Sequence, residues 1–223
     1  MKTSIHLFYA LTCVVLAAGM PAAAQQVAMS PELDKAASAA LESTLRVVQD
    51  SNNPSLLGLR SMEETDSVRL GDPLYVDTLS FDMLVEYQPE AELEQLFAGP
   101  GRAVVAVEVN GEVRSWISFV EEDDQWKLTG FGESATAMSV DRAADIVREQ
   151  EARLVHVPAF NTYLVRFADD DGVRLIPVGP TPIAEMKPNE VLRADEALER
   201  LAEHARKIDA EYGDEIRARR VVD

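Results

Sequence analysis

The sequence predicts an α+β fold, in which an antiparallel meander of strands carries amphipathic helices at both ends. The strongest observation is Asn110-Gly111, which separates an apolar run from an alternating one. Both residues accept a positive φ angle, so the pair is typical of a two-residue hairpin turn. Apolar side chains also recur at helical spacing, from Leu33 to Val48 and again over about residues 189–211. These two stripes predict the terminal helices.

Residues 1–24 have the three-part pattern of a cleavable secretory signal peptide. Lys2 supplies the positive start, residues 7–18 form an apolar run, and three alanines at 22–24 precede the expected cleavage site. A membrane anchor is the alternative, but a span needs about 20 apolar residues and this run is shorter. We therefore expect a secreted protein that begins near Gln25, is periplasmic or extracellular, and has no integral membrane span after cleavage.

The mature chain is strongly acidic and lacks cysteine. Cys13 is the sole cysteine and leaves with the signal, which excludes disulfides, thiol nucleophiles and cysteine metal ligands. The full chain has 21 basic and 39 acidic residues, and the signal removes one lysine and no acid, so the mature net charge is 20 − 39 = −19. Such a charge repels nucleic acid and anionic lipid. It attracts cationic partners or ions, or it serves solubility alone.

The mature chain divides into three parts. Residues 25–58 hold the first helix, capped by Ser30 with Pro31 in its first turn, and a linker. Residues 59–178 form an α+β sheet domain. Residues 179–223 hold a proline-rich linker and the last helix.

Turn residues set the element order within the sheet domain. An irregular segment is expected at 58–73, a strand with an apolar turn at 74–87, and a short helix at 90–97. Strands are expected at 103–109, 112–120 and 125–131, followed by a helix capped by Ser139 and by strands at 152–157, 162–167 and 173–178.

This order of elements hints at an internal duplication. Residues 90–120 run short helix, strand, turn, strand, and residues 139–178 run helix, strand, strand, turn, strand. The helix-then-hairpin order resembles the small exported α+β modules of the PepSY and protease-propeptide type. The resemblance implies two helix–hairpin units. It assigns no function by itself, because one fold serves many activities.

Apolar side chains in the last helix recur at alternating steps of four and three residues, as in a coiled-coil seam. The stripe consists of Ala194, Leu198, Leu201, Ala205, Ile208 and Tyr212. Two arrangements fit this stripe. Either the two terminal helices pack together, or each lies on the sheet or pairs in a homodimer.

No sequence motif carries catalytic or cofactor chemistry, so we predict no catalytic residue, no cofactor and no metal site. His156 and His204 are the only histidines after the signal, and neither has a second histidine at metal-ligand spacing. The acids at 121–124 and 169–171 are consecutive, whereas a calcium loop needs them at alternate positions. We interpret both runs as solvated hairpin turns.

Trp116 and Arg114 are the candidate binding residues. If side chains alternate strictly along the strand, both fall on its polar face, opposite Val113 and Ile117. Trp and Arg are enriched at binding hot spots, so the pair predicts a recognition patch for another protein or peptide. The alternative is that a helix covers this face and places Trp116 in the core.

Three classes of function fit these observations. The absence of a catalytic motif favours an exported, non-enzymatic binding or inhibitory module that works through a sheet face or edge. A structural or assembly protein would instead pair through its terminal helices. A small carboxylate-dependent hydrolase would need a deep pocket lined by two acids in unusual surroundings.

Overall fold

The computed structural model describes residues 29–89, 91, 93–97, 101–132, 134–147 and 150–220, and the predicted signal peptide lies outside them. The strands are β1 (Val68–Thr78), β2 (Arg102–Val109), β3 (Glu112–Glu122), β4 (Gln125–Gly132), β5 (Arg153–Val157), β6 (Thr162–Asp169), β7 (Gly172–Pro177) and β8 (Leu192–Arg193). The helices are α1 (Pro31–Ser51), α2 (Phe81–Glu86), α3 (Leu93–Leu96), α4 (Ser134–Asp145) and α5 (Ala194–Arg220), with 3-10 turns η1 (Pro54–Leu57), η2 (Met62–Ser67) and η3 (Pro158–Phe160).

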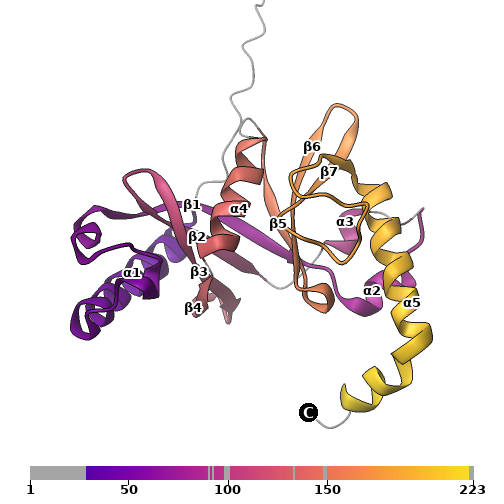
Figure 1. Cartoon of the computed structure of the whole chain (residues 1–223), viewed down its shortest axis with the longest axis horizontal. Helices are drawn as coiled ribbons and strands as arrows, with labels where there is room; N and C mark the ends of the chain where they lie inside the picture. The colour runs from indigo at the N-terminus through magenta and orange to yellow at the C-terminus, as the bar shows by residue number, and fades with distance from the viewer. Residues whose placement is uncertain are drawn as a thin grey trace, which may run out of the picture.

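The strands form one eight-stranded sheet in the order β4-β3-β2-β1-β5-β6-β7-β8. Neighbouring strands are antiparallel except β1 and β5, which are parallel. Helices α1 and α5 lie at opposite ends of the molecule (Figure 1). The predicted fold class, an α+β protein with an antiparallel sheet and a helix at each end, is therefore confirmed.

Helix α1 begins and ends where the sequence indicates. The Leu33 amide donates to the Ser30 hydroxyl at 3.1 Å, and Asn52, at φ 48°, ends the helix in the left-handed region. The buried side of α1 packs on one face of β1, β2 and β3. The core of this contact includes Leu33, Val48, Leu57, Val105, Val107, Ile117 and Phe119.

Helix α4 covers the opposite face of the sheet. Side chains of β1 alternate between the two faces, so Val76 packs beneath α4 whereas Tyr75 contacts the α1 cluster. The predicted cap at Ser139 is wrong, because α4 begins at Ser134. The Ser139 hydroxyl donates to the Ala135 carbonyl at 2.8 Å inside the helix. Local sequence does not distinguish a serine whose hydroxyl bonds to a carbonyl inside a helix from a serine that caps the start of a helix.

Helix α5 packs with α2 on the C-terminal half of the sheet. Its buried residues are Ala194, Ala197, Leu198, Leu201, Ala202 and Ala205, a broader face than the predicted seam. They share a core with Val155, Leu164 and Leu175, separate from the core of α1. The terminal helices α1 and α5 therefore do not pack on each other, and each lies on the sheet. The helix begins at Ala194 rather than near residue 189, because Leu192 and Arg193 form β8.

Strand β1 is the largest departure from the predicted elements. The segment 58–73 was expected to be irregular, but β1 starts at Val68 and pairs with β2 from Val68 to Tyr75. Its register shifts between Leu70 and Pro73, so Gly71 and Asp72 form a bulge. Glycine and proline suggest a loop, yet both are tolerated at bulges, where a ladder hydrogen bond is not required. The apolar segment after β1 is the short helix α2.

The predicted hairpin turns are confirmed. Asn110 and Gly111, at φ 53° and 79°, join β2 to β3, and Asp123 and Asp124, at φ 52° and 59°, join β3 to β4. The acidic turn between β6 and β7 is held internally, with Arg174 Nε 2.7 Å from a carboxylate oxygen of Asp169. The acidic residues at these positions thus form hairpin turns, as predicted.

Candidate functional site

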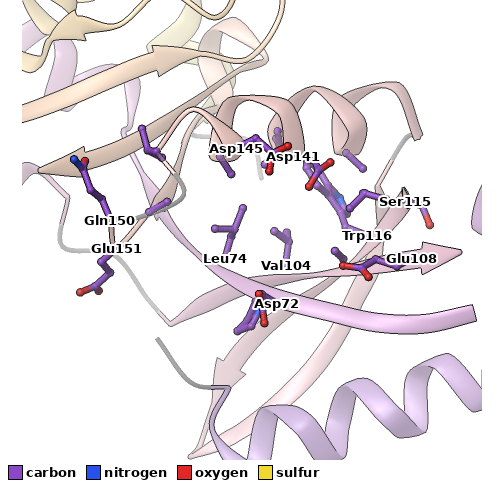
Figure 2. A pocket seen from close by; sticks show the side chains of 18 residues that line it. Asp72, Leu74, Val104, Glu108, Ser115, Trp116, Asp141, Asp145, Gln150 and Glu151 are labelled. Atoms are coloured by element: carbon purple, nitrogen blue, oxygen red, sulfur yellow. The ribbon is translucent and has the colours of Figure 1, made fainter. Parts of the chain in front are cut away.

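A cavity of about 370 Å³ lies between α4 and the face of the sheet that this helix covers (Figure 2). Strands β1, β2 and β3 supply its floor, α4 its roof, and residues 150–152 one wall. Drug-sized ligands occupy cavities of about 300–1,000 Å³, so this one suits a small molecule.

The floor of the cavity is apolar at its centre. Leu74 of β1 and Val104 of β2 form neighbouring partners in the sheet, and both side chains point towards α4 (Figure 2). Val140 and Val147 face them from the helix side. Desolvated aliphatic walls of this kind favour a ligand with an apolar body.

Five carboxylates surround this apolar centre. Asp72 comes from the β1 bulge, Glu108 from β2, Asp141 and Asp145 from α4, and Glu151 from the segment before β5. Lysine, arginine and histidine are absent from the described residues that line the cavity. The described lining is therefore rich in carboxylates.

Glu108 is the carboxylate most affected by its surroundings. Partial burial raises its pKa above the usual value of 4.5, and the negative charges of Asp72 and Asp141 raise it further. Gly71 leaves space for this carboxylate, because a Cβ there would lie 2.2 Å from a Glu108 carboxylate oxygen. A cation in the cavity would relieve the desolvation and repulsion that act on Glu108.

Trp116 lies at one side of the same cavity and is 5% exposed. Its indole packs against the backbone of β4 at Gly132, where a Cβ would lie 1.6 Å from Trp116 Nε1. Of the two predicted positions for Trp116, the structure has the buried one, in which helix α4 covers the side chain. The structure thus places Trp116 in the wall of a cavity under α4 rather than on an open face.

Arg114 does not share this position. A bulge in the pairing of β2 with β3, between Val107 and Glu108, breaks the strict alternation assumed from the sequence, so Val113 joins the α4 side. The side chain of Arg114 is 7% exposed and lies 3.5 Å from Glu64 and 2.9 Å from Glu112. The expectation that Val113 lies opposite Trp116 is wrong, and Arg114 forms its ion pairs outside the described lining of the cavity.

Ser115, His156 and His204 each contact groups other than one another. Ser115 lines the cavity, but its hydroxyl donates to the Leu57 carbonyl at 2.9 Å. His156 stacks on Tyr163 with ring centroids 4.5 Å apart, and His204 meets Phe160 edge-on. Burial lowers the pKa of His156 below 6.5, and the nearby charge of Arg102 lowers it further. These groups do not form a nucleophile–base pair.

The other side of the sheet holds a buried ion cluster. The carboxylate of Asp77, whose side chain is 4% exposed, lies 2.8 Å from Arg153 and 3.3 Å from Arg166. The guanidinium of Arg166 also lies 4.7 Å from the ring centroid of Phe97. This cluster fills the boundary between the core of α1 and the core of α5, and it ties β1 to β5 and β6.

Within the described residues, no three His, Cys, Asp or Glu side chains are arranged to hold a metal ion. Among the described helices, none combines the length and apolar character that crossing a bilayer requires.

The carboxylates of the cavity were not identified from the sequence, because 39 acids give no reason to select five. One signal does exist for Glu108, since it is the single acid within the otherwise apolar run 103–109. Its alternation with Val104 and Ala106 directs it to the face that α4 covers. Comparison with known proteins gives no further guide, because no family model, curated protein or solved structure matches the chain.

Proposed function

We propose that this protein is an exported binding module whose cavity under α4 takes a small organic cation with an apolar body. The observation that supports this most is the composition of the cavity, which combines an aliphatic centre and an indole wall with carboxylates and, in the described lining, no basic side chain. The proposal keeps the predicted export and the non-enzymatic binding role, and it names a class of ligand.

Electrostatics and desolvation both favour such a ligand. Glu108 and Asp141 are half-buried, and carboxylates at such positions attract a cation more strongly than fully exposed ones, because water screens them less. Trp116 adds an aromatic wall, and indole is the aromatic group that cations prefer. The mature net charge of −19 brings cations towards the protein from all directions.

Binding is tested by calorimetry and by fluorescence of a Trp126→Phe variant, in which Trp116 is the only tryptophan. Benzylamine and hexylamine are the cationic probes, with benzyl alcohol and hexanol as neutral controls. We expect the amines to bind and to change the Trp116 emission, and the alcohols to bind at least about tenfold more weakly. Equal affinity for amines and alcohols, or no binding of either, contradicts the proposal.

A matched pair of variants separates the cavity from general surface charge. Glu108→Gln removes a carboxylate of the cavity, whereas Glu122→Gln removes an exposed one that pairs with Lys127 on the β3–β4 hairpin. We expect Glu108→Gln to weaken amine binding and Glu122→Gln to leave it unchanged. Export is tested separately, by sequencing the N-terminus of the protein recovered from periplasm or medium, where a start near Gln25 is expected.

A carboxylate-dependent hydrolase is a second candidate, and Glu108 is the observation that favours it. A carboxyl group with a raised pKa beside other carboxylates is the arrangement by which hydrolases keep one acid protonated and another ionised. This candidate predicts turnover of a glycoside or ester substrate with a bell-shaped pH profile that Glu108→Gln abolishes. Amine binding without turnover across a panel of chromogenic glycosides and esters supports the binding module instead.

A further inference from the structure

We infer that the outer edge of β4 binds an extended segment of a partner protein, which adds a strand to the sheet and carries a lysine or arginine two residues after an apolar side chain. The side chains that recognise this segment lie on the face of the sheet that α1 covers, whereas the cavity lies under α4 on the opposite face. The two sites are therefore separate, and neither proposal depends on the other.

Strand β4 is an edge of the sheet that can accept another strand. It pairs with β3 on one side and with no other described strand. Its backbone amides and carbonyls that face away from β3 are therefore open to a further strand. The eight residues of β4 amount to an ordinary strand length, whereas β8, at the other edge, has only two. Lys127, the one charged side chain of β4, is held by Glu122 at 2.7 Å.

Exposed apolar side chains follow this edge on the α1 face. Leu128 lies opposite Phe119 of β3, and directly opposed residues of antiparallel strands point to the same face. Phe131 lies opposite Ile117 in the same way. Both β3 residues belong to the core under α1, yet Leu128 is 47% exposed and Phe131 is 41% exposed. A strand added beside β4 would bury part of both side chains.

An open hollow of about 410 Å³ lies beside the start of β4. Its lining combines two aromatic rings with three carboxylates and a hydroxyl, from Ser30, Glu32, Tyr75, Glu121, Asp124 and Trp126. The rings of Tyr75 and Trp126 have centroids 6.3 Å apart, and both side chains are half-buried. Among the described residues, no ion pair engages the carboxylates of the hollow.

A lysine or arginine side chain suits this hollow. Its hydrocarbon stem can pack on the aromatic rings while its cationic end reaches the carboxylates. Indole and phenol rings also attract a cation through their faces. Two features of different kinds thus meet at one place, because the edge of β4 takes the backbone of an extended segment and the hollow takes a basic side chain.

The spacing along β4 gives the order of residues in the segment. Trp126 precedes Leu128 by two residues and lies on the same face, opposite Glu121. An antiparallel ladder is slightly more stable than a parallel one, and an antiparallel segment runs against β4. Its residue beside Leu128 therefore comes two positions before its residue beside Trp126. The segment has an apolar side chain first and the basic one second.

A second copy of the chain fits this edge less well than a basic segment. Each copy has a net charge of −18, so two copies repel each other. Strand β4 also has no basic residue two positions after an apolar one, because Lys127 lies next to Leu128 and alternates to the other face. Charge and residue order therefore favour a basic segment of another protein.

The test is binding of the peptide acetyl-Thr-Val-Thr-Val-Thr-Lys-Thr-amide to the purified protein, measured by NMR and calorimetry. We expect saturable binding, with chemical-shift changes concentrated in β4 and slower hydrogen exchange of the β4 amides that face away from β3. Two control peptides have glutamate in place of lysine, or methyl groups on the backbone nitrogens. Each control is expected to bind at least about tenfold more weakly.

Two double variants of one acidic turn separate the hollow from general charge. Glu121→Gln with Asp124→Asn removes two carboxylates of the hollow, whereas Glu122→Gln with Asp123→Asn removes two that lie outside its described lining. Asparagine tolerates the positive φ angles of Asp123 and Asp124. We expect the first double variant to weaken peptide binding about tenfold and the second to change it by at most about twofold.

Leu128→Ser tests the apolar part of the edge. Leu56 is the control, because it is similarly exposed, at 44% against 47%, and lies on η1 rather than on β4. We expect Leu128→Ser to weaken peptide binding about fivefold and Leu56→Ser to leave it unchanged. Thermal unfolding checks that both variants remain folded.

The outcomes distinguish a strand added at β4 from other forms of binding. Absence of peptide binding overturns the inference, and so do shifts that lie outside β4 or equal binding of the control peptides. Equal weakening by the two double variants also overturns it, because general charge attraction then explains the affinity. Light scattering that shows self-association abolished by Leu128→Ser, without peptide binding, identifies a second copy as the occupant instead. Amine binding in the cavity does not bear on any of these results.

Discussion

The indole of Trp116 on β3 meets the ring of Tyr163 on β6 edge-on, with centroids 5.6 Å apart. In the order of the sheet β2, β1 and β5 lie between these two strands. Four strand spacings in a flat sheet amount to about 19 Å, so the sheet must curl to bring the two rings together. Its concave side encloses the core beneath α4 and the cavity beside it.

Gly132 makes room for the indole, and this requirement is directly testable. In Gly132→Ala the new Cβ would overlap Trp116 Nε1, so we expect a loss of about 1–3 kcal/mol in the free energy of unfolding. Urea denaturation followed by Trp116 fluorescence measures it. Gly130→Ala on the same strand is the control, because its Cβ would meet no atom within 4 Å. Equal stability of the two variants would show that the indole does not occupy this position.

Asp77 holds two arginines at the boundary between the cores. Asp77→Ala removes the carboxylate that lies 3.3 Å from Arg166, whose side chain is 13% exposed, so we expect a loss of about 3–5 kcal/mol in stability. Glu122→Ala breaks an exposed pair with Lys127 and should cost at most about 1 kcal/mol. Thermal and urea unfolding compare the two. A similar cost for both variants contradicts a buried cluster.

The raised pKa of Glu108 predicts a pH dependence of stability. The protonated form is favoured in the folded state, so its contribution is complete below the usual value of 4.5 and is lost as the pH rises through the raised pKa. Glutamine cannot ionise, so Glu108→Gln does not lose this contribution. The free energy of unfolding of the variant, relative to that of the original protein, should therefore rise as the pH is raised from 4 to 7. Unfolding at several pH values in the absence of amines checks it. A difference that does not vary with pH counts against the raised pKa.

The lowered pKa of His156 predicts the opposite dependence. The neutral imidazole is favoured in the folded state, so its contribution is complete above 6.5 and is lost as the pH falls through the lowered pKa. His156→Phe keeps a ring against Tyr163 but cannot be protonated. Its stability relative to the original protein should therefore rise as the pH falls below 6.5. NMR titration of the His156 ring gives an independent measurement, and a pKa at or above 6.5 would refute the prediction.

Helix α5 is an integral part of the C-terminal core. Leu198 is fully buried there, so Leu198→Ala should cost about 2–5 kcal/mol. Tyr212 lies further along the same helix and is 48% exposed, and Tyr212→Ala should change stability by less than about 0.5 kcal/mol. Urea unfolding compares both variants. If Leu198→Ala were neutral, α5 would not be packed on the sheet.

Much of the fold follows from local signals. Ser30 and Pro31 place the start of α1, and Asn110-Gly111 places the β2–β3 turn, because capping and positive φ depend on a few adjacent residues. The same signals gave a wrong start for α4 and concealed the first part of β1. At those positions pairing with a distant strand or packing on the sheet outweighs local preference.

The sequence therefore suffices for the α+β class, the antiparallel hairpins and the acidic character of the chain. Only the tertiary structure brings Glu108 and Glu151 to one cavity, because they lie in segments that are distant in the sequence. It also brings Val113 to the side of Trp116, since one bulge breaks the alternation of side chains along the strand. Burial and proximity belong to the folded chain, and both the pKa of Glu108 and the candidate site depend on them.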